Sequence, residues 1–413
     1  MNIGVIGLGK LGCSMFAAFA AAGNKVFGFD IDKNVRDYLR RKIAPVSETA
    51  LQDEINLGFE NFKIFDNTSQ VIEQSDVIYV IVPTPSLNDG TFDTQYLENV
   101  ILNISDVDSS CENKLIVITS TVLPGDTRLK LISKIRIKNE KISKIKFCYS
   151  PEFIALGSVL NDLKNPDFLL VGEEIPLSAD IHIEAMMTII KNKNIPIRRM
   201  SIESAEMAKI SINSYITSKI SFANAIGIAS ENIKNCSSKD VLSAIGSDSR
   251  IGKKYLNKGL GFGGPCFPRD NRAIQQVINR AEGLDYYLPI QNETFNTKLP
   301  DYYVKKIVQF CINKNLKNVL VVGLTYKDGS YLLEESQSYS ISLKLSKNYK
   351  VFYFDPDVSN NNKDLGLEEF NSNSKVIGDI FLLNCSRDQS KLNMVKKIIK
   401  EKNLNYFYLD IWG

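Results

Sequence analysis

The feature that most constrains the fold is a glycine-rich turn near the start of the chain. A short apolar strand at residues 2–6 leads into Gly7-Leu8-Gly9-Lys10-Leu11-Gly12, and a helix of small residues follows. A second apolar strand at 25–29 then ends in Asp30. This order is the dinucleotide-binding unit, in which glycines allow a tight turn and a close approach of the pyrophosphate to the backbone. The pattern predicts an α/β fold with a doubly wound sheet.

Within this unit, we expect Gly7, Gly9, Leu11 and Gly12 to contact the cofactor. Asp30 indicates which cofactor it is, because a carboxylate in this place accepts hydrogen bonds from the ribose of NAD and repels the 2′-phosphate of NADP. The alternative is a structural glycine turn with a capping aspartate. We expect the first interpretation, and therefore NAD.

Further strands alternate with helical segments along the first 200 residues. A buried-type strand at 76–82 is followed by Thr84, and another at 114–119 is followed by Thr121. Ligands of parallel sheets bind outside the carboxyl ends of the strands, which is where both threonines lie. Taken alone, either threonine would more often be a helix cap or a turn residue.

The last third of the chain repeats the plan of the first. Between the two repeated parts of the chain, apolar residues recur at helical spacing from 201 to about 230. A strand at 317–322 then leads to Gly323, and a strand at 350–354 ends in Asp355, much as the strand at 25–29 ends in Asp30. The chain is predicted to form three domains: an NAD-binding Rossmann domain at 1–200, a central helical domain at 201–305, and a second Rossmann-like domain at 306–413.

Composition excludes several kinds of partner and site. Lys and Arg number 50 against 47 Asp and Glu, without a dense basic run, which argues against nucleic acid and anionic membranes. No apolar run reaches the roughly 18 to 20 residues of a membrane span, so we expect a cytoplasmic protein with a small-molecule partner. Seven cysteines without CxxC spacing and a single histidine, His182, predict no metal site and no Ser-His-Asp triad. We expect His182 to be a plain surface or helix residue.

A second glycine-rich stretch, 261–270, holds the residue most suited to covalent chemistry. Its sequence is GFGGPCFPRD, so Cys266 lies among glycines and prolines beside Arg269 and Asp270. A cysteine in a long chain is usually a small core residue, but core cysteines lie in apolar periodic runs. These flanks favour an exposed thiolate with electrostatic support, and we expect Cys266 to be a nucleophile.

The stretch GFGGPCFPRD closely resembles the active-site loop of the nucleotide-sugar 6-dehydrogenases, the family of UDP-glucose and GDP-mannose dehydrogenases. The nearest family form reads GFGGSCFPKD, and the resemblance runs from about residue 1 to about residue 385. It implies two Rossmann-like domains joined by a long central helical dimerisation region. It also implies NAD as the cofactor, a nucleotide sugar as the substrate and a homodimer.

Other matching segments imply roles for single residues. The family segments VxTP and STVPxGT fall on Thr84, which lines the NAD site, and on Thr121, whose hydroxyl lies near the reacting carbon. The first glutamate of NPEFLREG falls on Glu152. The helix motif AEMAKLxxN places its catalytic lysine and asparagine on Lys209 and Asn213. From spacing alone, these two residues would be a solvated pair one helical turn apart.

The resemblance also implies a substrate site. Arg250 matches an arginine that reaches the sugar nucleotide of the neighbouring subunit, which would make the dimer obligatory, and Lys327 matches a lysine that binds the nucleoside diphosphate. Tyr255, Gly263 and Gly264 complete the expected substrate site.

Two positions depart from the family pattern. The second family glutamate falls on Leu156, and Glu334 replaces the arginine of RESP, so that an arginine contact with phosphate is lost. Both departures leave the identity of the sugar open.

The predicted reaction is a four-electron oxidation of a primary alcohol to a carboxylate. An aldehyde has no hydroxyl to expel a second hydride, so Cys266 adds to give a thiohemiacetal and then a thioester that water hydrolyses. Lys209 and Asn213 would stabilise the oxyanion and manage the alcohol proton. The residues that could order or deprotonate the water are Asp270, Glu152 and Thr121, and the sequence does not decide among them.

UDP-glucose is the favoured substrate, with a UDP-N-acetyl-hexosamine or GDP-mannose as alternatives. A two-electron dehydrogenase of the 3-hydroxyacid type shares the first domain and the helix, but it needs neither Cys266 nor a second nucleotide fold. A redox-sensing NAD-binding regulator does not need Lys209 and Asn213.

Overall fold

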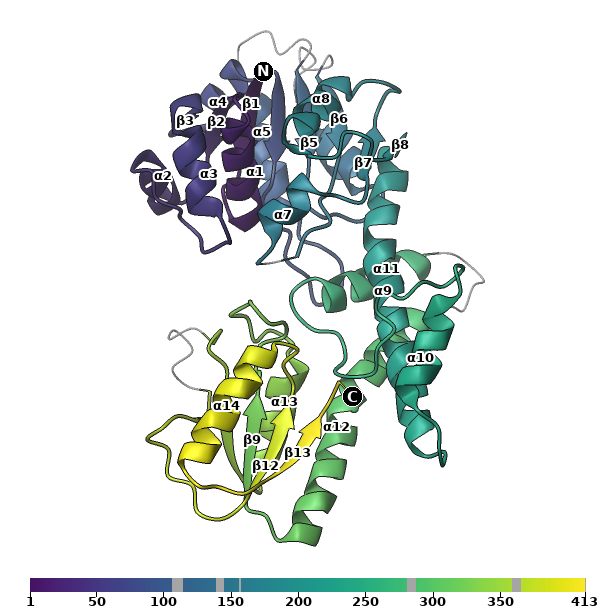
Figure 1. Cartoon of the computed structure of the whole chain (residues 1–413). Helices are drawn as coiled ribbons and strands as arrows, with labels where there is room; N and C mark the ends of the chain where they lie inside the picture. Colours follow the sequence, from purple (N-terminus) through teal and green to yellow (C-terminus); the bar gives the residue numbers. More distant parts are fainter. Residues whose placement is uncertain (106–113, 139–144, 156, 281–286, 359–364, 413) are drawn as a thin grey trace. The chain divides into compact units, whose positions relative to one another are not determined.

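The structure is a computed structural model, and it describes residues 1–105, 114–138, 145–155, 157–280, 287–358 and 365–412. The chain divides into two compact units, Met1–Ile210 and Ser211–Gly413. Each unit contains its own sheet with helices packed on it (Figure 1). The domain boundaries at residues 200 and 305 stay predictions.

The first unit contains one twisted sheet, and its strands are named in the order of the sequence. They are β1 (Asn2–Ile6), β2 (Lys25–Phe29), β3 (Phe62–Ile64), β4 (Val77–Val80), β5 (Leu115–Ile118), β6 (Lys146–Tyr149), β7 (Leu169–Glu173) and β8 (Ile197–Ser201). Their order in the sheet is β3-β2-β1-β4-β5-β6-β7-β8. Ile3 of β1 lies opposite Val26 of β2 and opposite Val77 of β4, in parallel register, whereas β7 pairs antiparallel with β6. The order reverses at β1, so the predicted doubly wound fold is confirmed.

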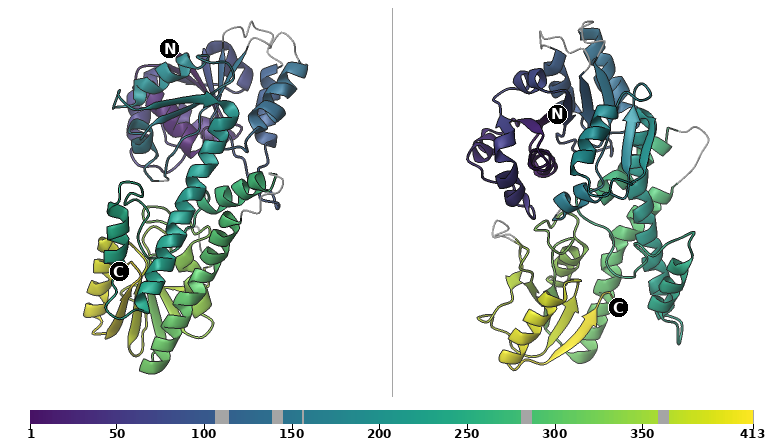
Figure 2. Two further views of the ribbon diagram at one scale, coloured as in Figure 1. Left: turned by 90° about the vertical axis from the view of Figure 1, so that its right-hand side faces the viewer. Right: turned by 45° about the horizontal axis from the view of Figure 1, so that its top comes forward.

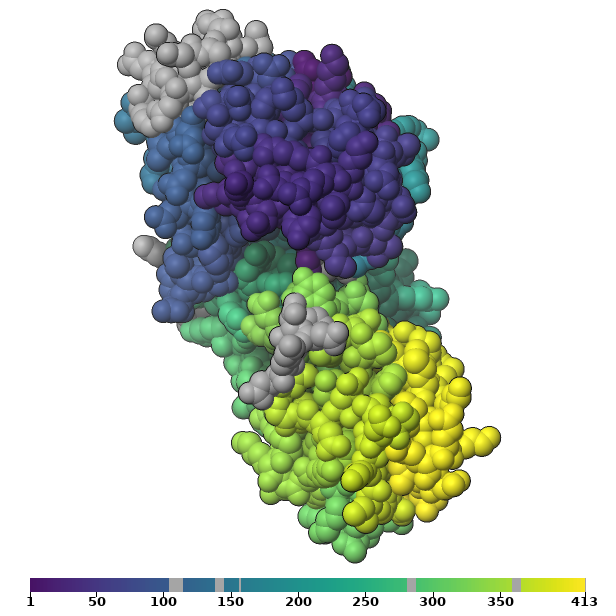
Figure 3. Space-filling view, turned by 90° about the vertical axis from the view of Figure 1, so that its left-hand side faces the viewer, coloured from purple at the N-terminus to yellow at the C-terminus, as the bar shows by residue number. Residues whose placement is uncertain are grey.

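Helices cover both faces of this sheet (Figure 2). They are α1 (Lys10–Ala21), α2 (Lys33–Arg40), α3 (Leu51–Gly58), α4 (Thr68–Gln74), α5 (Gln95–Ser105), α6 (Ser133–Lys138), α7 (Val159–Lys164) and α8 (Asp180–Ile189). A 3₁₀ turn at Phe59–Asn61 follows α3, and a π-helical turn at Thr127–Ile132 precedes α6. Side chains from the beginning of the chain, coloured purple, form the surface of one side of the unit in Figure 3.

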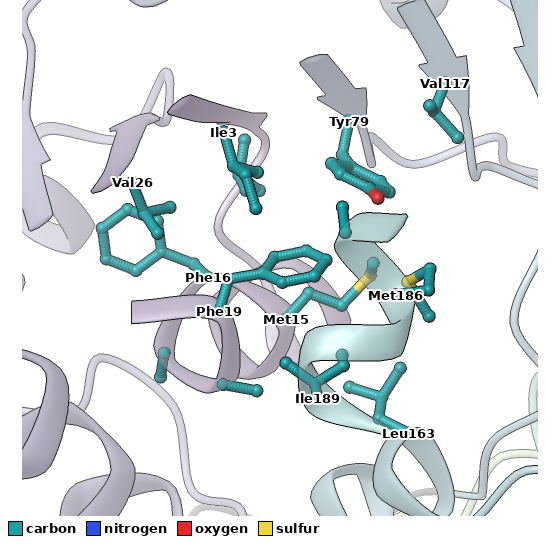
Figure 4. Close-up of a cluster of buried hydrophobic side chains, with 14 of the residues drawn as sticks. Ile3, Met15, Phe16, Phe19, Val26, Tyr79, Val117, Leu163, Met186 and Ile189 are labelled. Carbon is teal, nitrogen blue, oxygen red and sulfur yellow. The ribbon is translucent and has the colours of Figure 1, made fainter. Parts of the chain in front are cut away.

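The two faces are filled by alternate residues of the same strands. On β4, Val77 and Tyr79 pack in a cluster with α1, α3, α7 and α8, whereas Ile78 and Val80 pack in a cluster with α4, α5 and α6. Figure 4 shows Phe16 of α1 in the first of these clusters. Strands with both faces buried have nearly continuous apolar sequences, and the strands of this sheet follow that rule.

The interpretation of His182 is correct for its helix but wrong for its exposure. It lies in α8, as a helix residue, but its side chain is fully buried, so a surface position is wrong. Its Nδ1 is 2.9 Å from Tyr79 Oη and its Nε2 is 2.9 Å from Ser150 Oγ. Ser150 donates its own proton to Leu170 O, so Nε2 carries the ring proton and Nδ1 accepts from Tyr79. Burial lowers the pKa of His182 to about 3 and keeps the ring neutral.

The second unit begins within the long predicted helix. This helix is α9 (Ile202–Glu231), which starts in the first unit, and α10 (Ser238–Ser247), α11 (Phe267–Ile278), α12 (Leu288–Lys314), α13 (Gln337–Leu345) and α14 (Gln389–Glu401) follow. The strands are β9 (Asn318–Val322), β10 (Lys350–Phe354), β11 (Glu368–Glu369), β12 (Ile380–Asn384) and β13 (Tyr406–Asp410). They lie in the order β11-β10-β9-β12-β13, all parallel, which repeats the arrangement of β3-β2-β1-β4-β5. The predicted second Rossmann-like fold is confirmed.

The sheet of the second unit also has two covered faces. Val319 and Val321 of β9 pack with α12 and α13, whereas Leu320 and Val322 pack with α14. Among the helices that the structure describes, none combines the length and the apolar character that crossing a membrane requires.

Candidate active site

The glycines of the first turn have two different functions. A Cβ atom on Gly7 would lie 2.1 Å from Ile81 O, and one on Gly12 would lie 1.9 Å from Gly7 O, so close packing requires both glycines. Gly7 also has a φ of +92°, which side chains rarely adopt. A Cβ on Gly9 would meet nothing within 4 Å. The turn is therefore tightly packed on one side and open at Gly9.

Helix α1 begins at this open turn without a capping side chain. Gly9 is its N-cap residue, and the first turn, which contains Leu11, has no acidic residue. The first N–H groups of a helix have no partner within the helix, and the dipole is positive there. The start of α1 is thus suited to a phosphate group.

Asp30 holds this turn in place from the end of β2. Its Oδ2 accepts a hydrogen bond from Leu8 N at 2.6 Å, and its Oδ1 accepts one from Asp32 N at 2.8 Å. Asp30 is only half-buried, and each carboxylate oxygen has a further lone pair for a ribose hydroxyl. Asp30 can therefore act both as the cap of the turn and as the ribose ligand. The open turn, the uncapped helix and this carboxylate fit the dinucleotide expected from the sequence.

The two predicted threonines meet at the carboxyl ends of neighbouring strands. Thr84 follows β4 and Thr121 follows β5, and Thr84 Oγ1 donates to Thr121 O at 2.7 Å. Ser120 joins the same two loops, because its Oγ accepts from Val82 N and donates to Val82 O. Sequence reasoning had found the threonines but not the serine that ties their loops together.

Glu206 is a buried residue of α9 that the sequence interpretation did not single out. Its carboxylate accepts hydrogen bonds from Gly125 N at 2.6 Å and from Thr127 N at 3.0 Å, and so anchors the loop that follows Thr121. Burial raises the pKa of Glu206 to about 7, against the lowering effect of these hydrogen bonds. The only signal in the sequence was its place in the AEMAK segment.

Lys209 lies one turn further along α9 and contacts the loop after β6. Its Nζ donates to the backbone oxygen of Glu152 at 2.6 Å and lies 4.5 Å from the centre of the Phe153 ring. Lys209 is 8% exposed, so the interpretation of a solvated helix residue does not hold. Burial raises the pKa of the Glu152 carboxyl to about 7, although the Lys209 charge opposes this rise. Leu156, the first departure from the family pattern, lies outside the described residues.

In the second unit, Cys266 is exposed at the start of α11. It is the N-cap residue, and its carbonyl accepts from Asp270 N at 2.9 Å. The carboxylate of Asp270 is fully buried and accepts from Asn213 Nδ2 at 2.6 Å and from Arg269 Nε at 2.9 Å. Three predicted site residues therefore come together: the exposed thiol, the buried aspartate and the helix asparagine. A helix N-terminus stabilises a thiolate, which suits Cys266 to nucleophilic chemistry.

The glycines next to Cys266 pack against loops of the same unit. A Cβ on Gly263 would lie 2.5 Å from Glu335 O, and one on Gly264 would lie 2.5 Å from the Tyr326 ring. Gly264 N donates to Glu334 O at 3.0 Å. Glu334, the second departure from the family pattern, makes this contact through its backbone, so this hydrogen bond does not require its side chain.

Arg250 and Tyr255 lie in the segment before the cysteine loop. The side chain of Arg250 is 86% exposed and binds Asp248 through both Nε and Nη2. Tyr255 is exposed, and its ring packs edge-on against Phe267, the residue after Cys266. The structure thus brings Tyr255, but not the Arg250 side chain, into contact with the start of α11.

The turn after β9 resembles the turn after β1, but the carboxylate that holds it accepts more hydrogen bonds within the protein. Asp355, which corresponds to Asp30, accepts from Leu324 N, Thr325 N, Thr325 Oγ1 and Lys391 Nζ at 2.7 to 3.1 Å. The Asp355 side chain is fully buried, and that of Lys391 is 4% exposed. A ribose cannot reach this carboxylate as it can reach Asp30. The second fold therefore does not fit a dinucleotide bound in the manner of the first.

Lys391, in the first turn of α14, joins the two loops that follow β9 and β10. Besides Asp355, its Nζ pairs with Asp357 at 2.6 Å and with Asp328 at 3.1 Å. Burial alone would lower the pKa of Lys391, but hydrogen bonds to Asp355 and Asp357 raise it, so the lysine stays charged. Asp328 directly follows Lys327, the predicted diphosphate ligand, and accepts from Ser386 Oγ. The loop that carries Lys327 is thereby fixed.

Comparison with known proteins gives the chain a family context. Residues 1–191 match the NAD binding domain of the UDP-glucose/GDP-mannose dehydrogenase family, and residues 203–297 match its central domain. A putative UDP-glucose 6-dehydrogenase, YtcA of Bacillus subtilis, is 31% identical over 361 residues, which are 87% of this chain and 82% of that protein. A GDP-mannose 6-dehydrogenase of Pseudomonas putida is 27% identical over 366 residues, 87% of this chain and 81% of the relative.

A solved structure agrees with the fold. A UDP-glucose dehydrogenase from Pyrobaculum islandicum matches with a TM-score of 0.83 at 23% identity, covering 100% of this chain and 94% of its own. This likeness supports the arrangement of sheets and helices described above.

The raised pKa of Glu206 predicts how stability depends on pH. A carboxyl whose pKa is higher in the folded state than its ordinary 4.5 stabilises the fold at low pH and loses that effect as the pH rises through about 7. We expect the free energy of unfolding to fall between pH 5 and pH 8 by up to about 3 kcal/mol from this group. Glu206→Gln should remove this part of the slope in urea denaturation measured across that range.

Glu203→Gln is the matched control, because Glu203 lies on the same helix and its pKa is lowered, chiefly by a hydrogen bond to Arg128. This variant should keep the slope between pH 5 and pH 8. An unchanged slope in Glu206→Gln would contradict the assignment.

Proposed function

Because the chain belongs to the UDP-glucose/GDP-mannose dehydrogenase family, we propose that it oxidises C6 of a nucleotide sugar, with UDP-glucose favoured, to the uronate through Cys266. The chain is an NAD-dependent nucleotide-sugar dehydrogenase. The observation that carries the finer proposal is the exposed thiol at the start of α11, whose first turn contains the buried Asp270 that bonds Asn213.

The cofactor site is the turn after β1. Gly7, Gly9, Leu11, Gly12 and Asp30 would hold NAD there. When bound, NAD would accept a hydride from the carbon being oxidised, and a second NAD molecule would do so in the second oxidation. Thr84 would line the same site, since it lies at the end of the neighbouring strand β4. The remaining chemistry depends on side chains of this protein.

In the first oxidation, a base removes the proton of the C6 hydroxyl while C6 loses a hydride, which gives the aldehyde. The Cys266 thiolate then adds to the aldehyde carbon, and the former carbonyl oxygen becomes an oxyanion. As the carbon–oxygen double bond re-forms, a second hydride leaves and a thioester remains on Cys266. Water loses a proton to a base as it adds to the thioester, and the carbon–sulfur bond breaks. The carboxylate leaves, Cys266 becomes a thiolate again, and the second proton passes to solvent.

We assign the stabilisation of the oxyanion and the handling of the alcohol proton to Lys209 and Asn213, with Thr121 near the reacting carbon. Asp270 holds Asn213 through its hydrogen bond of 2.6 Å. For the hydrolytic water we favour Glu152, because a carboxyl with a pKa of about 7 exchanges protons readily near neutral pH. Asp270 already accepts from two donors, which suits it better to orientation.

The nucleotide sugar is proposed to bind with its diphosphate at Lys327. The loop that carries Lys327 is fixed by Lys391 and its three carboxylates. The sugar would contact Gly263 and Gly264 of the cysteine loop and Tyr255, whose ring packs on Phe267. UDP-N-acetyl-hexosamine and GDP-mannose are the alternative substrates. A two-electron dehydrogenase would leave the exposed thiol of Cys266 without a function.

We further propose a homodimer formed through α9. Tyr215 is 65% exposed and Phe222 is 48% exposed, and a spacing of seven residues places them on one face of this helix. Large exposed apolar side chains in line on one helix are typical of helix pairing. In such a dimer the exposed Arg250 would be available to the substrate of the neighbouring subunit.

Replacing the nucleophile should abolish the second half of the reaction. We expect Cys266→Ser to bind NAD as the wild type does but to form uronate roughly a thousandfold more slowly, since loss of a covalent nucleophile has effects of that order. NAD binding is measured by calorimetry and uronate by mass spectrometry. Cys236→Ser, at the half-exposed cysteine of the same unit, is the control and should keep its activity. Normal uronate formation by Cys266→Ser would contradict the covalent scheme.

A scan of substrates tests the choice of sugar. UDP-glucose, a UDP-N-acetyl-hexosamine and GDP-mannose are offered separately with NAD, and kcat/KM is determined for each. We expect the largest value with UDP-glucose. A clear preference for either of the others would show that the substrate assignment is wrong while leaving the chemistry intact.

A further inference from the structure

The loop that leads to Cys266 has little conformational preference of its own. Four of the six residues from 259 to 264 are glycines. Glycine loses more conformational freedom on folding than any other residue, so such a segment needs partners outside itself to adopt one conformation. The thiol follows two residues after this segment. Its position therefore depends on what holds the glycine backbone.

One partner is Asn296 of α12, which is 5% exposed. Its Oδ1 accepts from Phe262 N at 2.9 Å, and its Nδ2 donates to Phe262 O at 2.9 Å. A side-chain amide carries the same donor and acceptor as a peptide group, so Asn296 pairs with Phe262 as a neighbouring strand would. Both backbone groups of this buried residue are thereby satisfied.

A second partner is Asn224 of α9, which is fully buried. Its Oδ1 accepts from Gly259 N at 2.8 Å, and its Nδ2 donates to Leu260 O at 3.2 Å. Tyr303 of α12 completes this end of the segment, because its hydroxyl donates to Gly259 O at 2.8 Å. Asn224 thus holds the entrance of the loop as Asn296 holds its middle.

The glycines themselves are explained by this arrangement. A Cβ on Gly261 would lie 2.0 Å from Asn296 Oδ1, and a Cβ on Gly259 would lie 2.1 Å from the Trp412 ring. A side chain at Gly261 would displace the amide from Phe262. The sequence motif is glycine-rich here because this chain's own side chains approach the backbone closely.

Helix α9 also holds the part of the chain that follows Cys266. Asn213 bonds Asp270, four residues after Cys266, and Asn224 bonds the loop six residues before it. These two asparagines are eleven residues apart on α9, which is about 16 Å along a rigid helix. Cys266 lies in the sequence between two points that α9 fixes. A shift of either point would move the thiol.

We propose that Asn224 and Asn296 are positioning residues that set the place of the Cys266 thiol for attack on the aldehyde. This inference rests on the proposed function. The two amides bond the backbone of residues 259–262 and act through it. Reactions that depend on a precise approach of two atoms lose up to about a hundredfold in rate when the geometry shifts by about 1 Å.

The test compares Asn224→Ala and Asn296→Ala with Asn292→Ala. Asn292 is the matched control because it is also 5% exposed, lies one turn earlier on α12 and bonds Ser218 Oγ at 2.8 Å instead of the loop. We expect kcat with UDP-glucose to fall about 10- to 100-fold in the two loop variants, while KM for NAD stays the same. Asn292→Ala should keep the wild-type kcat at a temperature where all variants are folded.

Hydrogen exchange gives a readout that does not require turnover. The amides of Gly259 and Phe262 should lose protection in Asn224→Ala and Asn296→Ala, respectively, and keep it in Asn292→Ala. If an alanine variant does not fold, the serine variant at the same position replaces it, because one hydroxyl cannot make both hydrogen bonds.

Each outcome has a distinct meaning. Wild-type kcat and protection in the loop variants would overturn the positioning role, as would an equal loss of kcat in Asn292→Ala. A wild type that oxidises no nucleotide sugar would overturn the proposed function instead. Hydrogen exchange would then still decide whether the two amides hold the loop.

Discussion

The structure depends on a single hydrogen-bonding device that occurs twice: a carboxylate at the end of a strand holds the backbone of the turn after the neighbouring strand. Asp30 bonds Leu8 N in the first unit, and Asp355 bonds Leu324 N in the second. In the first unit the carboxylate stays half-buried and open to a ribose. In the second unit, Lys391 Nζ takes up a further accepting position of the Asp355 carboxylate. The first fold thus keeps a carboxylate available for the proposed cofactor, and the second fixes the loop that carries Lys327.

The loops of the candidate site share a second property. They are irregular, so their backbone groups need partners that secondary structure does not supply. Buried polar side chains of the long helices provide them: Glu206 for the loop after β5, Lys209 for the loop after β6, and Asn224 for the cysteine loop. Burying such groups is costly unless they are fully hydrogen-bonded, which explains why each meets backbone atoms directly. Helix α9 therefore organises the loops of each unit.

The fold was largely predictable because local patterns encode it. The glycine turn, Asp30 and the alternation of strands and helices sufficed for both doubly wound sheets, and the cysteine loop indicated the family. What was missed depends on residues distant in the sequence. Glu206 lies 81 positions from Gly125, and Asn296 lies 34 from Phe262. A lone Asn or Glu in a helix carries no local sign of such a partner, and the burial of His182 had none either.

The proposed function requires one protein to carry a sugar alcohol through two oxidations by way of Cys266. The most direct measurement is the number of NADH molecules formed for each UDP-glucose consumed by the wild-type protein, with the product identified by mass spectrometry. We expect two NADH and the uronate, without free aldehyde. One NADH per sugar, with the aldehyde as the product, would contradict the claim.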